Sequence, residues 1–202
     1  MIIAFIGTMD DESETPISGT GKTCSMVGFG YMDFLEKNKV YSNFNTNFSE
    51  EVIGFQAMIN KLKGVPSPNV KLMVSEMQNV LNSIGSTNQQ VLFIDSFASQ
   101  MRKIDVDLYY DTQRFMNIHK RLRVHTDVIL IPYKTHLDNQ PCYFNRCKKP
   151  HKIYVYSQKP FKSKPIICFD ASEVGKKYDT YEIIYDTLNI PKKSKETVEN
   201  GD

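Results

Sequence analysis

Ser18-Gly19-Thr20-Gly21-Lys22-Thr23 is the stretch of sequence that decides the fold. It follows the apolar run of residues 2–6 and precedes a segment whose apolar residues have helical spacing, which is where a P-loop joins a strand to a helix. In such a loop, backbone N–H groups bind phosphate oxygens, the lysine reaches the β- and γ-phosphates, and the threonine hydroxyl ligates Mg²⁺. We therefore predict a nucleotide site made of these six residues and the adjoining Cys24. The alternative is a glycine-rich turn that only caps a helix.

The beginning of this loop departs from the usual P-loop pattern. The pattern G-x-x-x-x-G-K-[ST] requires glycine at position 16, where this chain has Pro16. Gly7 lies further back, beyond an insert at 9–15 that carries four acidic residues. The departure is compatible with nucleotide binding but argues against fast hydrolysis.

Length and composition are typical of one α/β domain. The chain has 202 residues, of which 41% are hydrophobic, and a net charge of +2, which excludes a collagen-like or a strongly charged disordered protein. We predict a single domain over residues 1–190, with edge strands and a basic loop region at 132–190, and a disordered tail at 191–202. No apolar run approaches the ~18–20 residues needed to span a bilayer, and the N-terminus lacks a signal leader. We therefore expect a protein of the host cytoplasm, free or associated with a virion, with its four cysteines reduced.

The alternation of apolar and polar segments predicts a largely parallel sheet. Expected strands are 2–7, 40–43, 70–74, 106–110 and 127–131, and expected helices are 23–37, 49–63, 76–85 and 88–103. From Pro132 onward the chain is richer in proline and lysine, and short strands at 152–156 and 165–169 predict a small antiparallel addition at the sheet edge.

A hydrolytic P-loop enzyme also needs an apolar strand that ends in carboxylates. Asp95 follows one apolar run, and Ser75-Glu76 follows another. If Asp95 ended a strand, only about ten residues would remain for a crossover before the strand at 106, which is below the usual minimum. We therefore place the acidic site at Ser75-Glu76 and assign Asp95 to a solvated helix.

Several motifs in order resemble the FtsK–HerA superfamily of P-loop DNA-pumping ATPases, in particular small archaeal-virus and plasmid ATPases related to genome-packaging motors. They are SGTGKT at 18–23, VYSN at 40–43, LMVSEMQNVL at 72–81, SQMRKIDVDLYYDTQRF at 99–115 and IHKRLRVHTDVILIP at 118–132. Zot-like phage assembly proteins share part of the pattern, including the VYSN-type strand. The resemblance implies a RecA/FtsK-like fold that binds ATP and Mg²⁺, assembles as a homo-oligomeric ring and acts on double-stranded DNA, with capsid proteins as further partners.

The resemblance also implies roles for individual residues. Lys22 and Thr23 would hold phosphates and Mg²⁺, Glu76 would polarise the attacking water, and Gln113 would be a polar sensor near the γ-phosphate. Arg102 is the first candidate for an arginine finger, with Arg121 and Arg123 behind it, since a planar guanidinium suits spread transition-state charge. The sensor and arginine-finger assignments have alternatives: Gln113 can be an ordinary loop residue, and each arginine can be a surface residue or a DNA contact.

Ser75 stands where the family has aspartate. A hydroxyl can still bond a Mg²⁺-bound water, which makes Ser75 a metal-associated candidate, but one negative charge is missing. The leading interpretation is an ATP-driven double-stranded DNA translocase that packages a viral genome. The alternatives are a Zot-like nucleotide switch for virion assembly or extrusion, and a nucleotide-binding protein with weak or no hydrolysis.

Two further patterns lie in the second half of the chain. Basic residues gather there and form either a nucleic-acid contact or a solvated surface: Arg102, Lys103, Lys120, Arg121, Arg123, Arg146, Lys148, Lys149 and Lys152. The spacing H-x5-C-x4-C-x3-H supplies imidazole and thiolate ligands that can close a tetrahedral Zn²⁺ site: His136, Cys142, Cys147 and His151. The cysteine gap is longer than in common zinc knuckles, which favours free thiols and surface histidines.

Overall fold

The computed structural model describes residues 1–7, 19–62, 69–81, 96–101, 103–142 and 147–179. Some positions discussed above lie outside these ranges. They are the acidic insert, Pro16, Ser18, the end of the expected helix 76–85 after residue 81, the part of the expected helix 88–103 up to Asp95, Arg102, Arg146 and everything after residue 179.

The described residues form one eight-stranded sheet in the order β3-β2-β4-β5-β1-β6-β7-β8. Its strands are β1 (Ile2–Ile6), β2 (Lys39–Ser42), β3 (Glu51–Val52), β4 (Val70–Val74), β5 (Val106–Thr112), β6 (Val128–His136), β7 (His151–Lys159) and β8 (Ile167–Asp170). The strands from β1 to β6 pair in parallel, whereas β6 with β7 and β7 with β8 are antiparallel. The prediction of a mostly parallel sheet with a small antiparallel C-terminal addition is confirmed.

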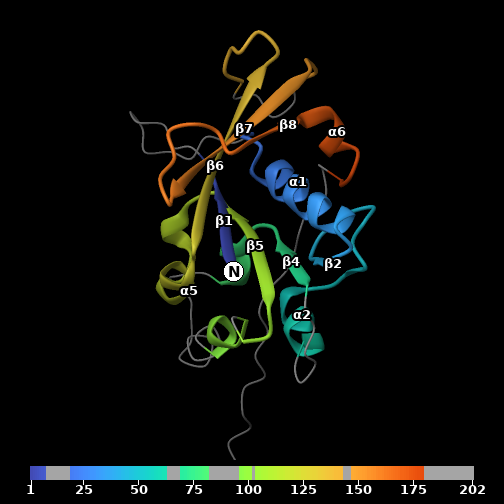
Figure 1. The fold of residues 1–202 in the computed structure, drawn as a ribbon, viewed down its shortest axis with the longest axis vertical. Coiled ribbons are helices and arrows are strands. Elements are labelled where there is room, and N and C mark those ends of the chain that lie inside the picture. The colour runs from blue at the N-terminus through green and yellow to red at the C-terminus, as the bar shows by residue number, and fades with distance from the viewer. Residues whose placement is uncertain (8–18, 63–68, 82–95, 102, 143–146, 180–202) are drawn as a thin grey trace, which may run out of the picture.

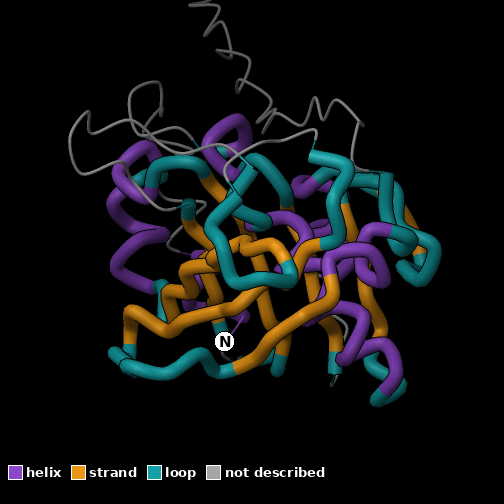
Figure 2. The backbone as a smooth tube through the Cα atoms, turned by 90° about the horizontal axis from the view of Figure 1, so that it is seen from above, coloured by secondary structure: helices purple, strands orange, loops and turns teal. Residues whose placement is uncertain are grey.

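Helices cover both faces of this sheet (Figures 1 and 2). They are α1 (Lys22–Leu35), α2 (Phe55–Leu62), α3 (Met77–Val80), α5 (Lys120–His125), α6 (Ala171–Gly175), the 3₁₀ turn η1 (Phe115–Asn117) and a helical stretch at 96–101. Alternate residues of each strand face opposite layers. In β1, Ile2 and Ala4 join the core under α2, the 96–101 helix and α5, while Ile3 and Phe5 join the core under α1. No helix in the described ranges combines the length and apolarity that crossing a membrane requires.

Three expected elements, two helices and one strand, differ from the observed ones. The segment 49–63 is not a single helix, because Glu51–Val52 pairs with the edge of β2 before α2 begins at Phe55. The backbone N–H of Ile53 donates to the carbonyl of Ser42, and this pairing takes precedence over the helical periodicity. The helix expected to run to residue 85 ends at Val80, since Leu81 leaves the helical conformation.

The fifth expected strand is longer than its apolar run. β6 continues from Val128 through Pro132 to His136. β1 pairs with β6 only through Leu130, whereas β7 accompanies β6 to its end. Pro132 therefore lies where β6 has lost one neighbour, and a residue without a backbone N–H is tolerated at such an edge.

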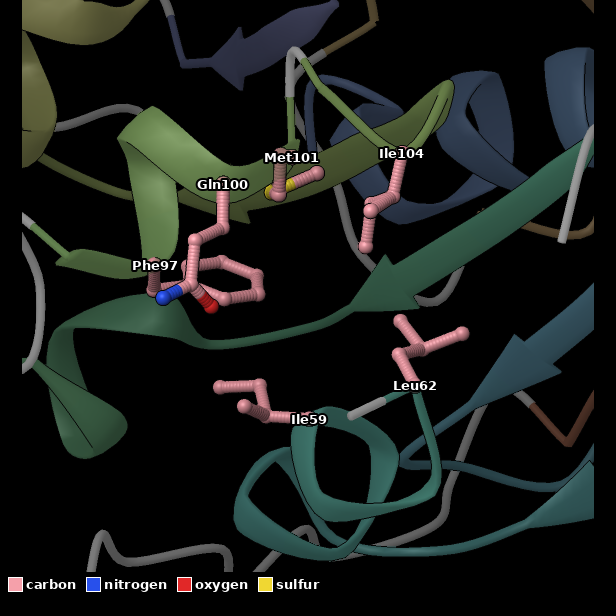
Figure 3. A pocket seen from close by; sticks show the side chains of 6 residues that line it. All are labelled: Ile59, Leu62, Phe97, Gln100, Met101 and Ile104. Atoms are coloured by element: carbon pink, nitrogen blue, oxygen red, sulfur yellow. The ribbon is translucent and has the colours of Figure 1, made fainter. Parts of the chain in front are cut away.

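A small pocket between α2 and the 96–101 helix belongs to the packing of the core (Figure 3). Its lining is mostly apolar: Ile59, Leu62, Phe97, Gln100, Met101 and Ile104. The volume of about 20 Å³ is room for a single water molecule. The pocket is therefore not a nucleotide site. Phe97 and Met101 lie on a helix, as the sequence predicted for residues 88–103.

Candidate nucleotide-binding site

The glycine-rich loop leads directly into α1. Gly19 and Gly21 have φ of 77° and 91°, a left-handed region that favours glycine. Gly21 is the N-cap residue of α1, and its carbonyl accepts the first intrahelical bond from Ser25 N at 2.8 Å. A Cβ atom on Gly21 would lie 2.7 Å from Cδ1 of Ile153 in β7. Both the backbone conformation and this contact therefore require glycine at position 21.

The N-terminus of α1 suits an anion. The first turn of this helix carries no acidic residue, so the unpaired N–H groups and the helix dipole remain available to a phosphate. Thr20 is 2% exposed, yet its Oγ1 has no hydrogen-bond partner among the described residues. A buried hydroxyl without a partner is costly. A bound phosphate oxygen would satisfy it, which is an independent sign that the loop is built for a ligand.

Asp111 of β5 stands at the centre of the polar cluster beside this loop. In the sheet, β5 lies between β1 and β4, so its C-terminal end lies between the P-loop and the end of β4. Thr23 Oγ1 donates to Asp111 Oδ2 at 2.5 Å. Ser75 Oγ donates to both carboxylate oxygens, at 3.1 and 3.0 Å. Asp111 is fully buried, and it joins the two residues that the sequence assigned to Mg²⁺.

Asn43, the last residue of the VYSN motif, fixes the end of β4. Its Oδ1 accepts from Ser75 N at 2.8 Å, and its Nδ2 donates to Ser75 O at 3.2 Å. Both backbone groups of Ser75 are thereby held by one side chain. The Ser75 hydroxyl is consequently positioned towards Asp111 by bonds that do not depend on a ligand.

Glu76 follows Ser75 in a left-handed conformation, with φ of 54°. Its backbone N–H donates to Asp111 Oδ1 at 2.7 Å, and its carboxylate accepts from Gln78 Nε2. Burial raises the pKa of Glu76, and the negative charge of Asp111 raises it further, while Lys22 and Gln78 act in the opposite direction. A carboxylate with a raised pKa is a stronger base for a proton from water.

The remaining candidates have different positions. Gln113 is exposed and follows the last residue of β5 directly. Arg121 is exposed on α5, and Arg123 on the same helix donates to Met116 Sδ at 2.8 Å. Cys24 is buried in the first turn of α1, where burial raises the pKa of its thiol to about 12. The Cys24 thiol is therefore neutral at physiological pH, and a role for Cys24 in nucleotide binding stays a prediction.

Sequence reasoning missed Asp111. The sequence interpretation concentrated on Thr112-Gln113 at the tip of the strand, although a carboxylate directly after the apolar run Leu108-Tyr109-Tyr110 was a signal. Alternate residues of β5 share a face, and Asp107, Tyr109 and Asp111 all face α1, with Tyr109 Oη donating to Asp33 Oδ2 of α1 at 2.8 Å. Only the order of strands in the sheet shows that Asp111 meets Thr23 and Ser75.

The donor set fits a hydrated Mg²⁺ ion. Hydroxyl and carboxylate oxygens are the ligands this cation takes, usually with several waters retained. A threonine hydroxyl has one donor and two lone pairs, so Thr23 can ligate a metal while it still donates to Asp111. Ser75 and Asp111 would hold the metal-bound waters. Asp111 thereby supplies a negative charge that Ser75 lacks.

The four residues of the H-x5-C-x4-C-x3-H pattern also meet. The potential ligand atoms of His136, Cys142, Cys147 and His151 all lie within 4.8 Å of one another. This cluster is at the far end of β6 and the beginning of β7, separate from Asp111.

Comparisons with known proteins bear on the fold. No family model and no curated protein matches the sequence. Among solved structures, the chain is similar to the N-terminal domain of zonular occludens toxin from Neisseria meningitidis, with a TM-score of 0.52, 16% identity and coverage of 88% of this chain and 98% of that one.

It is also similar to the genome packaging NTPase B204 of Sulfolobus turreted icosahedral virus 2 in complex with ATPγS, with a TM-score of 0.51 and 12% identity over 82% of this chain and 98% of that one. The DNA-packaging ATPase B204 of Sulfolobus turreted icosahedral virus has a TM-score of 0.50 and 14% identity over the same shares. At such identities the likeness concerns the fold. Together with the glycine-rich loop between β1 and α1, it gives this chain the fold of a P-loop NTPase.

Proposed function

We propose that this protein is a Mg²⁺-dependent ATPase that hydrolyses ATP beside α1. The observation that carries the proposal is the convergence of Thr23, Ser75 and Asp111 next to a glycine loop whose buried Thr20 hydroxyl has no hydrogen-bond partner in the described part of the chain. A turn that merely capped a helix would need none of these groups. The convergence of hydroxyls on one buried carboxylate supports a metal-assisted phosphate chemistry.

Each residue has a role that its chemistry permits. Backbone N–H groups of the loop and the Lys22 ammonium bind the phosphates, and Thr23 contributes its hydroxyl to the metal. Mg²⁺ supplies positive charge against the β- and γ-phosphates. Asp111 and Ser75 hold metal-bound water, and Glu76 accepts a proton from the attacking water. Gln113 is the candidate sensor, and an arginine of a neighbouring subunit, with Arg102 first, would complete the charge compensation.

We assign this ATPase to the movement of double-stranded DNA, and more narrowly to packaging a viral genome. The fold shared with packaging NTPases supports this choice, as do exposed basic residues such as Lys148, Lys149 and Lys152. Contacts to phosphates would make binding indifferent to sequence. A homo-oligomeric ring working beside capsid proteins, in the host cytoplasm or on the virion, completes the proposal.

The test measures steady-state ATP hydrolysis with and without duplex DNA. We expect Mg²⁺-dependent turnover that duplex DNA stimulates. Lys22→Ala should lower ATP turnover by at least about 100-fold, because it removes the ammonium whose positive charge stabilises the transferred phosphate. Glu76→Gln should lower turnover by about 100-fold or more while ATP still binds. Binding of ATP without turnover, unchanged by Glu76→Gln, would refute the ATPase and leave a non-hydrolysing nucleotide-binding protein.

A second candidate function is a nucleotide switch in virion assembly or extrusion. The similarity to the zonular occludens toxin domain favours it. A switch would hydrolyse ATP slowly and with no response to duplex DNA, and its partner would be a protein. Turnover that depends on Lys22 and Glu76 but ignores DNA at every salt concentration tested would select this function over translocation.

A further inference from the structure

The end of the β6–β7 hairpin gathers two histidines and two cysteines from four points of the chain. His136 is the last residue of β6 and is paired directly with His151, the first residue of β7. Cys142 comes from the segment after β6, and Cys147 from the segment before β7. All four potential ligand atoms lie within 4.8 Å of one another.

The backbone brings Cys142 back to β6 through specific bonds. After His136 the chain turns, with His136 N donating to Gln140 O at 2.8 Å, and it then returns along β6, where Cys142 N donates to Lys134 O at 3.0 Å. A bridge between Thr135 and Pro141 continues this pairing. Cys142 and His151 thus flank the end of β6 on opposite sides. The convergence is therefore a product of strand pairing and not of a freely placed surface loop.

The distances suit a tetrahedral ion. Zinc bonds of about 2.3 Å to sulfur and about 2.0–2.1 Å to nitrogen put neighbouring ligand atoms about 3.3–3.8 Å apart. Cys147 Sγ and His136 Nε2 are 3.4 Å apart, which already matches. The widest separation, 4.8 Å, requires the remaining side chains to close by about an ångström.

Burial provides a second, independent observation. His151 is 8% exposed, and its Nε2 is buried without a hydrogen-bond partner among the described residues. Cys142 is 1% exposed. An unpartnered buried ring nitrogen is costly, and a metal ion bound through this nitrogen would remove the cost. A disulfide between the two cysteines would explain neither the two converging imidazoles nor this nitrogen.

We propose that His136, Cys142, Cys147 and His151 form a structural Zn²⁺ site that closes the end of the β6–β7 hairpin. Two thiolates neutralise the charge of the ion, with their two protons released to solvent on binding. Four protein ligands leave no open position, which is typical of a structural and not a catalytic zinc site. Ile153, two residues further along β7, lies so near the glycine loop that a Cβ atom added to Gly21 would be 2.7 Å from its Cδ1. The ion therefore anchors the strand that supports one side of that loop.

The test uses the full chain, purified without a metal-affinity tag. Plasma mass spectrometry should find about one zinc ion per chain. After chelation and reconstitution with Co²⁺, the visible bands of tetrahedral cobalt and a sulfur-to-cobalt charge-transfer band should appear. Cys147→Ser, whose side chain is only partly buried, should lose both the zinc and the charge-transfer band.

Cys168→Ser is the matched control, because Cys168 is an exposed cysteine of β8 outside the cluster. It should retain zinc at the wild-type level. A purified chain without zinc that also gives no tetrahedral cobalt spectrum would overturn the proposal, as would full zinc retention in Cys147→Ser. Because Cys142→Ser removes a fully buried group and can fail to fold, the decision rests on Cys147→Ser and on the cobalt spectrum.

Discussion

At the scale of single residues, Asp111 is the side chain on which the candidate site depends. It accepts hydrogen bonds from Thr23, from Ser75 and from the backbone of Glu76. Ser75 departs from the expected aspartate, but a carboxylate is still present beside the P-loop because the neighbouring strand supplies it. We therefore expect the carboxylate of Asp111 to compensate for the charge that is missing at position 75.

Asp111→Asn should lower Mg²⁺-dependent hydrolysis by about 10–100-fold, the usual effect of removing a partner that orients a metal's ligands. The amide keeps the shape but lacks the charge and can accept at only one atom. Steady-state turnover over a Mg²⁺ titration measures the effect.

Asp107→Asn makes the same change on the same face of the same strand, four residues away from the site, and it should leave the Mg²⁺ dependence unaltered. The double variant Ser75→Asp with Asp111→Asn returns a carboxylate to the site from β4, and part of the lost turnover should return with it. Equal turnover in wild type and Asp111→Asn would remove Asp111 from the proposed site.

Lys71 provides a second prediction at this scale. Its Nζ lies 2.5 Å from Asp107 Oδ2 and 3.7 Å from Asp33 Oδ1, and all three side chains are about 15% exposed. Burial acts to raise the pKa of Asp107, but bonds from Lys71 and the N-terminal ammonium outweigh it and lower the pKa below its ordinary value. Burial raises the pKa of Asp33.

Lys71→Met should therefore lower the unfolding free energy by about 1–3 kcal/mol at neutral pH, because it removes the positive charge that the partly buried carboxylates of Asp33 and Asp107 share. A lowered carboxyl pKa contributes stability above the ordinary pKa, and this contribution disappears as the pH falls through the lowered value. The gap between wild type and Lys71→Met should consequently narrow below about pH 4.

Urea unfolding across this pH range measures the gap. Lys61→Met removes the lysine of an exposed pair with Glu51, which should change stability by less than about 1 kcal/mol. A Lys71→Met penalty that stayed constant with pH would show that lost packing, and not charge, accounts for it.

At the scale of elements, helix α1 approaches the sheet closely because it carries glycines on its buried side. A Cβ atom on Gly30 would lie 2.2 Å from Sδ of Met73, a fully buried residue of β4. Elsewhere in a helix interior, alanine is favoured over glycine by about 1 kcal/mol. At Gly30 the clash outweighs this gain.

Gly30→Ala should therefore destabilise the protein by about 1–3 kcal/mol, the usual cost of overpacking a core. Gly175→Ala is the control, since a Cβ at the end of α6 meets no atom within 4 Å, and its stability should change by less than about 1 kcal/mol. Thermal unfolding of both variants checks the contrast. A stabilised Gly30→Ala would mean that Met73 moves aside without cost.

The same scale shows what the sequence could predict and what it could not. β1, the loop and α1 are continuous in the chain, so apolar periodicity and Gly19–Thr23 were enough to predict them. β3 was missed because two residues pair only where β2 offers an edge. Asp111 was missed because its contacts depend on β5 lying between β1 and β4, an order that no local pattern contains. For His136, Cys142, Cys147 and His151, the spacing along the chain disfavoured a metal site, whereas strand pairing brings their four potential ligand atoms within 4.8 Å of one another, so a zinc site there stays a proposal.

At the scale of the whole molecule, the charge distribution bears on the proposed DNA contact. Lys148 and Lys149 are exposed beyond the C-terminal end of β6. The nucleotide site is at the same end of the sheet, where β4 and β5 finish. Lys37 and Lys39 are equally exposed but lie at the beginning of β2, at the opposite end of the parallel strands.

Replacement of Lys148 and Lys149 by glutamine should weaken duplex binding and reduce the slope of log affinity against log salt by up to about 2, since each phosphate contact contributes about 0.9. DNA-free ATP hydrolysis should be unchanged, because neither side chain belongs to the nucleotide site. The paired substitution Lys37→Gln and Lys39→Gln alters net charge equally and should leave the slope unaltered. Fluorescence anisotropy of labelled duplex over a salt series measures it. Equal slopes in both double variants would mean that only net charge matters, and the DNA surface would then have to be sought on another face, with the exposed Lys120 and Arg121 of α5 next to be tested.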